Sequence, residues 1–296
     1  MKGRDFFKWG LAVLILVFLI RYLFLSWGDL SEYEFSLNIG LFLLSYLFVI
    51  AHLIFVALGR GLILNLLEKN KLSLLKGIRI RTFADFGRFV PGKVWLVLGR
   101  IEMCKKFGLR TSTVTFSTLM EVFMNLLSAC LLAVLIFILF VGGELSQYSW
   151  YFVIFVPILL IFLHPKLFNW IMKFLSKLIK KDFVKIKAKY YYLLSLLSVF
   201  VVAWLLLGVG FYLMVNSLYA IGISSLLPLT AVLAVSWVFG FVMIFVPAGI
   251  GFREVALSYL LTFFLPEPVA VLVAILARVW LISGEILTAF IFWWIR

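Results

Sequence analysis

The chain has 296 residues, of which 65% are hydrophobic and 14% are charged. Soluble domains are about 45–50% apolar and about 25% charged, so this composition excludes a soluble enzyme domain and predicts that lipid surrounds most of the chain. The net charge of +14 does not indicate nucleic-acid binding, because the basic residues fall in short loops beside apolar runs, as the positive-inside rule requires.

The first two apolar runs set the orientation of the chain. A helix is predicted over Trp9–Leu25, and the three basic residues before it place the N-terminus in the cytoplasm. A second helix, over about Asn38–Leu58, returns to a basic loop that begins at Arg60. This loop is therefore predicted to be cytoplasmic.

The apolar segment Thr82–Gly99 lies between two basic clusters, both expected in the cytoplasm. A single crossing would put one cluster outside, so the sequence predicts a re-entrant hairpin that turns at Pro91 and Gly92. Proline lacks an N–H and glycine tolerates positive φ, which suits a break at membrane depth. Protein or water must then cover the exposed backbone. The segment also carries three charged residues: Asp85, Arg88 and Lys93.

The rest of the chain predicts six further helical segments. These are Thr113–Val141, Trp150–His164, Tyr191–Val215, Leu226–Val246, Phe252–Leu265 and Val269–Ile295. Residues 165–190 form a basic cytoplasmic loop or a surface helix, since apolar residues recur at helical spacing between lysines. The lysines either contact anionic headgroups or act only as a topology signal. Whether 226–265 crosses twice or dips in from outside stays open, and either route leaves the C-terminus in the cytoplasm.

Two proline motifs indicate an internal inverted repeat. Phe89–Lys93 and Phe245–Gly249 both begin Phe-Val-Pro, and each is followed by charged residues and a long helix. Glu121 lies 30 residues after the first proline, and Arg278 lies 31 after the second. Broken apolar segments at matching places in two halves are typical of a transporter's binding site. The chain is then a single transmembrane domain, 1–296, with a first repeat at about 38–141 and a second at about 191–296.

Charged residues at bilayer depth are costly, which makes them candidates for function. The candidate headgroup and translocation residues are Asp85, Arg88, Pro91, Gly92, Lys93, Arg100, Glu121, Asn125, Pro247, Gly249, Gly251, Arg253, Glu254, Arg278 and Glu285. Arginine suits a phosphate because its planar fork binds two oxygens. The alternative is a set of structural ion pairs: Asp85–Arg88, Glu121–Arg278 and Arg253–Glu254. No catalytic residue, metal or cofactor is predicted.

Two motifs and two single charged residues form one pattern: Phe86–Val94, Arg100, Glu121 and Pro247–Glu254. This pattern resembles the lysylphosphatidylglycerol synthase transmembrane (flippase-like) family, as a stand-alone member without the aminoacyl-transfer domain. The resemblance implies a helical bundle with re-entrant helices that translocates phospholipids or other lipid-linked molecules. The family pattern has Glu-Arg and a nearby aspartate, whereas this chain has Glu121-Val122 and Asn125. This difference leaves the substrate open.

Together these features predict an all-α integral membrane protein, a polytopic bundle of about 7–8 helices with one or two re-entrant segments. We expect a flippase-like transporter rather than an enzyme, in the plasma membrane of a bacterium or archaeon, with both termini cytoplasmic. Its partners would be membrane lipids, including an anionic or phosphate-bearing lipid substrate, and no nucleic acid. The expected protein partners are a second copy of the chain or an enzyme of a glycolipid pathway. The alternative function is a membrane enzyme or accessory subunit in lipid-linked sugar or glycolipid synthesis.

Overall fold

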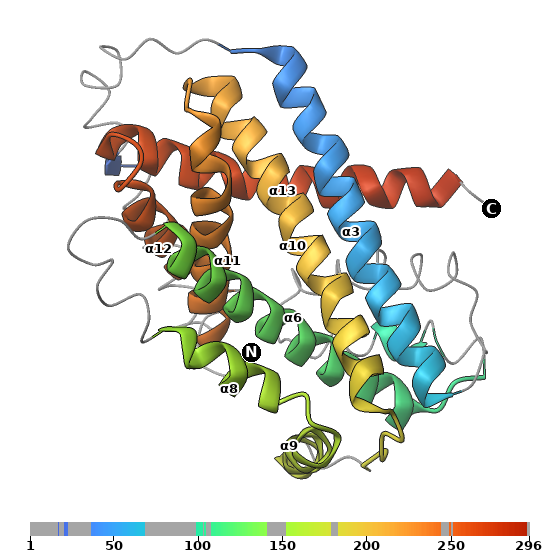
Figure 1. Cartoon of the computed structure of the whole chain (residues 1–296). Helices are drawn as coiled ribbons and strands as arrows, with labels where there is room; N and C mark the ends of the chain where they lie inside the picture. Colours follow the sequence, from blue (N-terminus) through green and yellow to red (C-terminus); the bar gives the residue numbers. More distant parts are fainter. Residues whose placement is uncertain are drawn as a thin grey trace.

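Figure 1 shows the computed structural model of the chain. It describes residues 37–68, 99–102, 108–140, 152–178, 183–243 and 251–294, together with residues 17, 21, 22, 104 and 249. Helices account for 86% of these residues, and none of them is in a strand. The predicted first helix and the predicted hairpin at 82–99 lie almost entirely outside the described residues.

The described helices are α3 (Ile39–Leu67), α6 (Thr111–Phe140), α8 (Phe155–Ile161), α9 (Pro165–Leu178), α10 (Tyr190–Leu218), the short 3₁₀ helix η3 (Ile223–Ser225), α11 (Leu226–Val242), α12 (Phe252–Leu261) and α13 (Glu267–Trp294). Five stretches are long and apolar enough to cross a membrane: Ile39–Leu67, Thr111–Phe140, Tyr190–Leu218, Ile223–Val242 and Glu267–Phe292. The prediction of an all-α, multi-pass membrane protein is therefore confirmed.

Helix α3 continues well beyond its predicted end at Leu58. Asn38 caps its first turn, since Asn38 Oδ1 accepts a hydrogen bond of 3.1 Å from the N–H of Leu41. At the other end no proline interrupts the chain, and the apolar residues after Gly61 extend the helix to Leu67. Arg60 is thus helical and fully buried, and its predicted position in a cytoplasmic loop is wrong.

Helices α3 and α10 run antiparallel and side by side (Figure 1). Small residues allow this close approach, as is common between membrane helices. A Cβ atom added at Gly59 of α3 would lie 2.7 Å from the ring of Phe200 on α10, and one added at Gly210 of α10 would lie 3.0 Å from the carbonyl oxygen of Ser45 on α3. The two backbones could not come so near with larger residues.

Helix α13 crosses this pair at a steep angle (Figure 1). Two hydrogen bonds fix the crossing: Trp280 Nε1 donates to Ser45 Oγ at 2.9 Å, and the hydroxyls of Tyr46 and Ser283 lie 2.8 Å apart. Gly284 lets α13 approach α3 closely, because a Cβ at this position would lie 2.5 Å from Val49 of α3. Apolar residues of α3, α6, α10, α11, α12 and α13 form one buried core around this point.

The chain bends by 70° between α8 and α9. Helix α8 has only seven residues, so it is shorter than the predicted Trp150–His164 helix. Helix α9 decides between the two structures left open for residues 165–190: the first part is a helix, and residues 183–189 that follow have no regular structure. A second buried core, formed by residues of α3, α6, α9 and α10, lies beneath α9.

Helices α11 and α12 are the two arms predicted on either side of the second proline motif. With η3, α11 forms a 20-residue candidate span. Helix α12 has ten residues and therefore extends only about 15 Å, half of a hydrocarbon core of about 30 Å. It is too short to cross alone, and it packs against α11 and α13.

Candidate functional site

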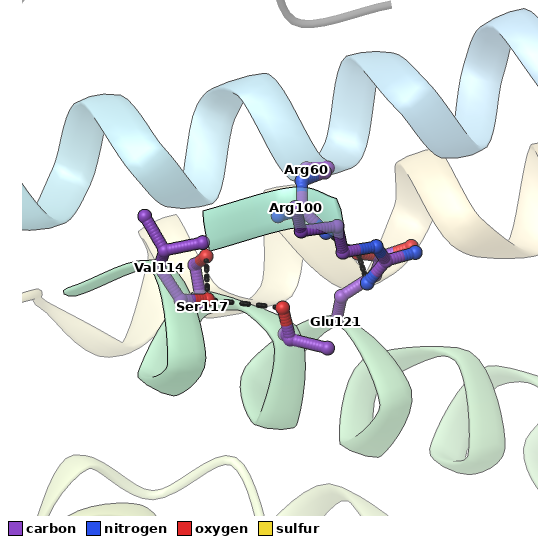
Figure 2. Close-up of polar contacts among 6 residues, drawn as sticks. Arg60, Arg100, Val114, Ser117 and Glu121 are labelled. Carbon is purple, nitrogen blue, oxygen red and sulfur yellow. Dashed lines mark hydrogen bonds and ion pairs between the residues drawn. The ribbon is translucent and has the colours of Figure 1, made fainter. Parts of the chain in front are cut away.

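Glu121 of α6 binds two arginines from other elements. Arg60 Nη1 of α3 donates to Glu121 Oε2 at 2.8 Å, and Arg100 Nη1 donates to the same oxygen at 3.1 Å. Figure 2 shows the three side chains converging from three separate segments. Their side chains are 0%, 4% and 6% exposed for Arg60, Arg100 and Glu121. We call these three residues the Glu121 centre.

Arg100 reaches Glu121 because its short helical segment is packed into the bundle. Ile101 and Cys104 of this segment are buried against Leu64 of α3 and against Leu109 and Val114 at the start of α6. This small apolar cluster holds Ile101 and Cys104 between the two helices. Arg100 therefore points inward and meets the same oxygen of Glu121 as Arg60 does (Figure 2).

The Glu121 centre is closed and strongly electrostatic. A buried ion loses several kcal/mol of hydration, which is recovered only when partners with good geometry surround it. Two guanidinium groups and one carboxylate give these three residues a net charge of +1 (1 + 1 − 1). Burial raises the pKa of the nearby Cys104 thiol, and the positive charges of Arg60 and Arg100 lower that pKa in part. This effect places Cys104 within the field of both arginines.

The polar residues on either side of Glu121 are turned toward their own helix. Ser117 and Thr118 both donate to the carbonyl oxygen of Val114, at 2.8 and 2.9 Å. Asn125 accepts a hydrogen bond of 3.3 Å at its backbone oxygen from Trp204 Nε1. Its side-chain Oδ1 is buried and has no hydrogen-bond partner within the described part of the chain. The hydroxyls of Ser117 and Thr118 therefore bond to their own helix rather than to Glu121.

A second centre forms around Glu254, the third residue of α12. Glu254 Oε2 accepts a hydrogen bond of 2.6 Å from the N–H of Gly251, just before the helix. Glu254 Oε1 lies 3.4 Å from Arg278 Nη1 of α13. The glutamate side chain is 3% exposed, whereas the arginine side chain is 18% exposed. We call Glu254 and Arg278 the Glu254 centre; it is half-open where the Glu121 centre is closed.

Two glycines shape the turn that leads into Glu254. Gly249 and Gly251 have φ values of 65° and 89°, which L side chains rarely adopt. A Cβ at Gly249 would also lie 2.6 Å from the carbonyl oxygen of Gly240 on α11. Backbone conformation therefore explains both glycines of the Pro-Ala-Gly-Ile-Gly sequence, and close packing also explains Gly249.

The predicted candidates divide into three groups. Arg100, Glu121, Glu254 and Arg278 belong to the two centres, with Gly249 and Gly251 in the turn. Arg253, Asn125 and Glu285 are half-buried on α12, α6 and α13. The remaining candidates lie outside the described residues: Asp85, Arg88, Pro91, Gly92, Lys93 and Pro247.

The ion pairs differ from those that the structural alternative predicted. Glu121 pairs with Arg60 and Arg100 rather than with Arg278, and Glu254 pairs with Arg278 rather than with Arg253. Arg253 follows Gly251 at the very start of α12, so its side chain leaves the helix in a different direction from that of its neighbour. The third predicted pair, Asp85–Arg88, falls outside the described residues.

Arg60 is the residue of the Glu121 centre that the sequence analysis did not select. It stands after a run of about 20 apolar residues, where a membrane helix commonly ends. The available signal was the second hydrophobic stretch, from Leu62 to Leu67, with no proline between the two stretches. Within the described part of the chain, no group of three or more His, Cys, Asp or Glu side chains is arranged to hold a metal ion.

Comparisons with protein-family models, with curated proteins and with solved structures give no match to this chain.

Proposed function

We propose that this protein is a flippase-like transporter that moves a phospholipid, or another lipid-linked molecule bearing a phosphate, across the plasma membrane of a bacterium or archaeon. The proposal includes the orientation expected from the basic loops, with both termini in the cytoplasm. It also includes membership of the lysylphosphatidylglycerol synthase transmembrane family, on the resemblance of the two proline motifs.

One observation carries the proposal: Arg278 is a partly exposed cation in the middle of an apolar helix. It lies in the candidate span Glu267–Phe292 and makes one ion pair, of 3.4 Å, within the described part of the chain. A guanidinium has five N–H donors, so one carboxylate oxygen leaves donors for an anionic group. Charged side chains inside a membrane usually face a water-filled cavity or a substrate pathway.

Glu254 supports the same role by holding Arg278 in place. The carboxylate is fixed at one oxygen by the Gly251 N–H and meets Arg278 with the other. The arginine is thus held on one side and open on the other. The N-terminus of α12 lies beside it, and helix N-termini favour anions. A lipid phosphate could exchange places with water at this point while its acyl chains stay in the bilayer.

The Glu121 centre has a different part in this proposal. Its three side chains are buried, so we assign it to holding α3, the helical segment 99–102 and α6 together. A transporter needs such a rigid body against which its other elements move. A headgroup would therefore be bound first at the Glu254 centre.

A liposome assay tests the proposal. Purified full-length protein is reconstituted in phosphatidylcholine liposomes with fluorescent phosphatidylglycerol, and dithionite bleaching measures movement between leaflets. We expect movement above that of protein-free liposomes. Arg278→Gln should slow it by about tenfold or more, because a hydrogen bond to a charged group contributes about 1.5–3 kcal/mol. Arg278→Lys should keep part of the rate, since it keeps the charge but not the fork.

The matched control is Arg110→Gln, which removes one exposed arginine outside the spans. This variant should transport as the unmodified protein does. If the unmodified protein moves neither phosphatidylglycerol nor a polyprenyl-phosphate probe, transport is overturned. If Arg278→Gln and Arg110→Gln behave alike, Arg278 is not the headgroup residue.

A further inference from the structure

Helix α9 has three different faces. Phe168, Met172 and Ser176 recur every four residues and are buried. A second face carries three exposed lysines: Lys166, Lys173 and Lys177. A third face carries exposed apolar residues: Trp170, Phe174 and Leu178, which are 65%, 54% and 64% exposed. An ordinary surface helix has only a buried and a polar face, so the exposed apolar face requires a separate explanation.

The rotation of α9 about its axis is fixed by the bundle. Phe168 packs edge-on against Phe123 of α6, with ring centroids 5.4 Å apart. Asn169 ties the helix to the following segment: its Nδ2 donates to the carbonyl oxygen of Ile186 at 3.0 Å, and its Oδ1 accepts from the N–H of Ile186 at 2.8 Å. The apolar and basic faces of α9 are therefore held outward in a defined direction.

The position of α9 in the chain places it at the membrane boundary. The preceding helix α8 exposes apolar side chains, among them Phe155 at 49% and Ile161 at 57%, as expected for a helix in lipid. The chain then bends by 70° into α9. Helix α9 has 14 residues, too few to cross a bilayer, and its lysines would be costly at bilayer depth. The bend between α8 and α9 therefore lies at the surface of the membrane.

We propose that α9 lies in the membrane interface and binds anionic phospholipid headgroups. Its exposed face with Trp170, Phe174 and Leu178 enters the boundary between headgroups and acyl chains. Tryptophan is enriched at that depth, and Trp170 stacks with Phe174 at a centroid distance of 6.4 Å. The lysine face runs along one side of this apolar face, where the flexible lysine stems reach the phosphates.

Charge selects anionic lipids over neutral ones. Helix α9 contains three lysines and no acidic residue, a net charge of +3. Basic residues beside an apolar interfacial face attract anionic leaflets. This lipid site differs from the Glu254 centre, because it holds lipids at the rim and needs no movement between leaflets. It therefore stands or falls independently of transport.

The test measures which lipid surrounds Trp170. Full-length protein is placed in nanodiscs made of equal parts phosphatidylglycerol and phosphatidylcholine, with bromine on the acyl chains of one lipid or the other. The chain has ten tryptophans, so the quenching of Trp170 is obtained by subtracting a Trp170→Phe variant. We expect brominated phosphatidylglycerol to quench Trp170 at least about twice as strongly as brominated phosphatidylcholine does. The reason is that each nearby lysine changes the local affinity for an anionic lipid about fivefold.

Three lysine variants decide the outcome, each measured with and without Trp170→Phe. In the triple variant Lys166→Gln, Lys173→Gln and Lys177→Gln, the two brominated lipids should quench Trp170 equally. The same three lysines changed to Arg should keep the preference, which shows that the helix remains folded. The matched control, Lys185→Gln, Lys187→Gln and Lys189→Gln, removes equal charge from the connecting segment and should also keep it. Equal quenching in the unmodified protein, or an equal loss in the α9 triple variant and the control, overturns the proposal.

Discussion

Glu121 and Glu254 each hold arginines from elements that are distant in the sequence. Glu121 is 61 residues from Arg60 and 21 from Arg100, and Glu254 reaches Arg278 across the turn between α12 and α13. A buried ion pair seldom adds much net stability, but removing one partner leaves the other charge uncompensated. Each carboxylate therefore fixes the relative position of two or three elements.

Replacing Glu121 with glutamine should strongly destabilise the protein. Gln keeps the shape of the side chain but removes the charge that two buried guanidinium groups share. Breaking such a pair costs about 3–5 kcal/mol. We expect the Tm of the purified protein in detergent to fall by several degrees. Size-exclusion chromatography after heating measures this Tm.

The control for this change is Glu267→Gln. Glu267 is exposed in the first turn of α13, where a carboxylate contributes only about 0.3–1 kcal/mol through the helix dipole. Its Tm should stay close to that of the unmodified protein. Equal melting of the Glu121→Gln and Glu267→Gln variants would show that Glu121 does not hold the two arginines together.

The sequence identified both carboxylates and two of their three arginine partners, but not which residues pair. Glu121 stands out as the one charged residue of a long apolar run, and Arg278 shares its apolar run with Glu285 alone. Their pairing depends on which helices become neighbours, and a spacing of 61 residues gives no sign of that. Arg60 was assigned to a loop because the helix was ended after about 20 residues, the length that a bilayer requires. Because Arg60 is buried and paired with Glu121, α3 can continue past this arginine to Leu67.

At the scale of elements, glycines decide how closely the helices pack. Gly284 of α13 faces Val49 of α3, and an added Cβ would lie 2.5 Å from one Val49 methyl group. Gly284→Ala should therefore lower the Tm, since overpacking a tight contact costs about 1–3 kcal/mol. Val49→Ala removes the methyl group and should restore most of the Tm in the double variant. A melting series of the two single variants and the double variant measures the coupling.

Gly222→Ala is the matched control for this series. Gly222 lies before η3 with φ −66°, and a Cβ there would meet only Ser224 Oγ, at 3.4 Å. This variant should melt as the unmodified protein does. Additive effects of Gly284→Ala and Val49→Ala would mean that α3 and α13 do not touch at this point.

Element boundaries were predicted best where the sequence contains a breaker. The turn before α12 was found from its proline and glycines, and α10 and α13 lie within three residues of their expected ends. Helix α8 was expected to be about twice as long, because hydrophobicity alone does not reveal where a helix bends. After the bend, Phe168 and Met172 of α9 pack into the second core, a contact that composition cannot show.

For the whole molecule, the open question is which side of the membrane each end of a span faces. Helix α10 has 29 residues and extends about 43 Å, enough to cross a core of about 30 Å. Lys185, Lys187 and Lys189 lie just before its first residue, whereas residues 219–225 after it carry no charge. The positive-inside rule then predicts that the lysines face the cytoplasm and that η3 lies outside.

Single cysteines at the two ends of α10 test this orientation. In a variant with Cys104 and Cys130 replaced by Ala, Ser224→Cys and Lys187→Cys are compared; both positions are exposed. A maleimide that cannot cross membranes should label Ser224→Cys in intact cells and Lys187→Cys only after lysis. Labelling of both from outside would mean that α10 does not cross. Labelling of Lys187→Cys alone would reverse the orientation, and the basic face of α9 would then meet the outer leaflet rather than the inner one.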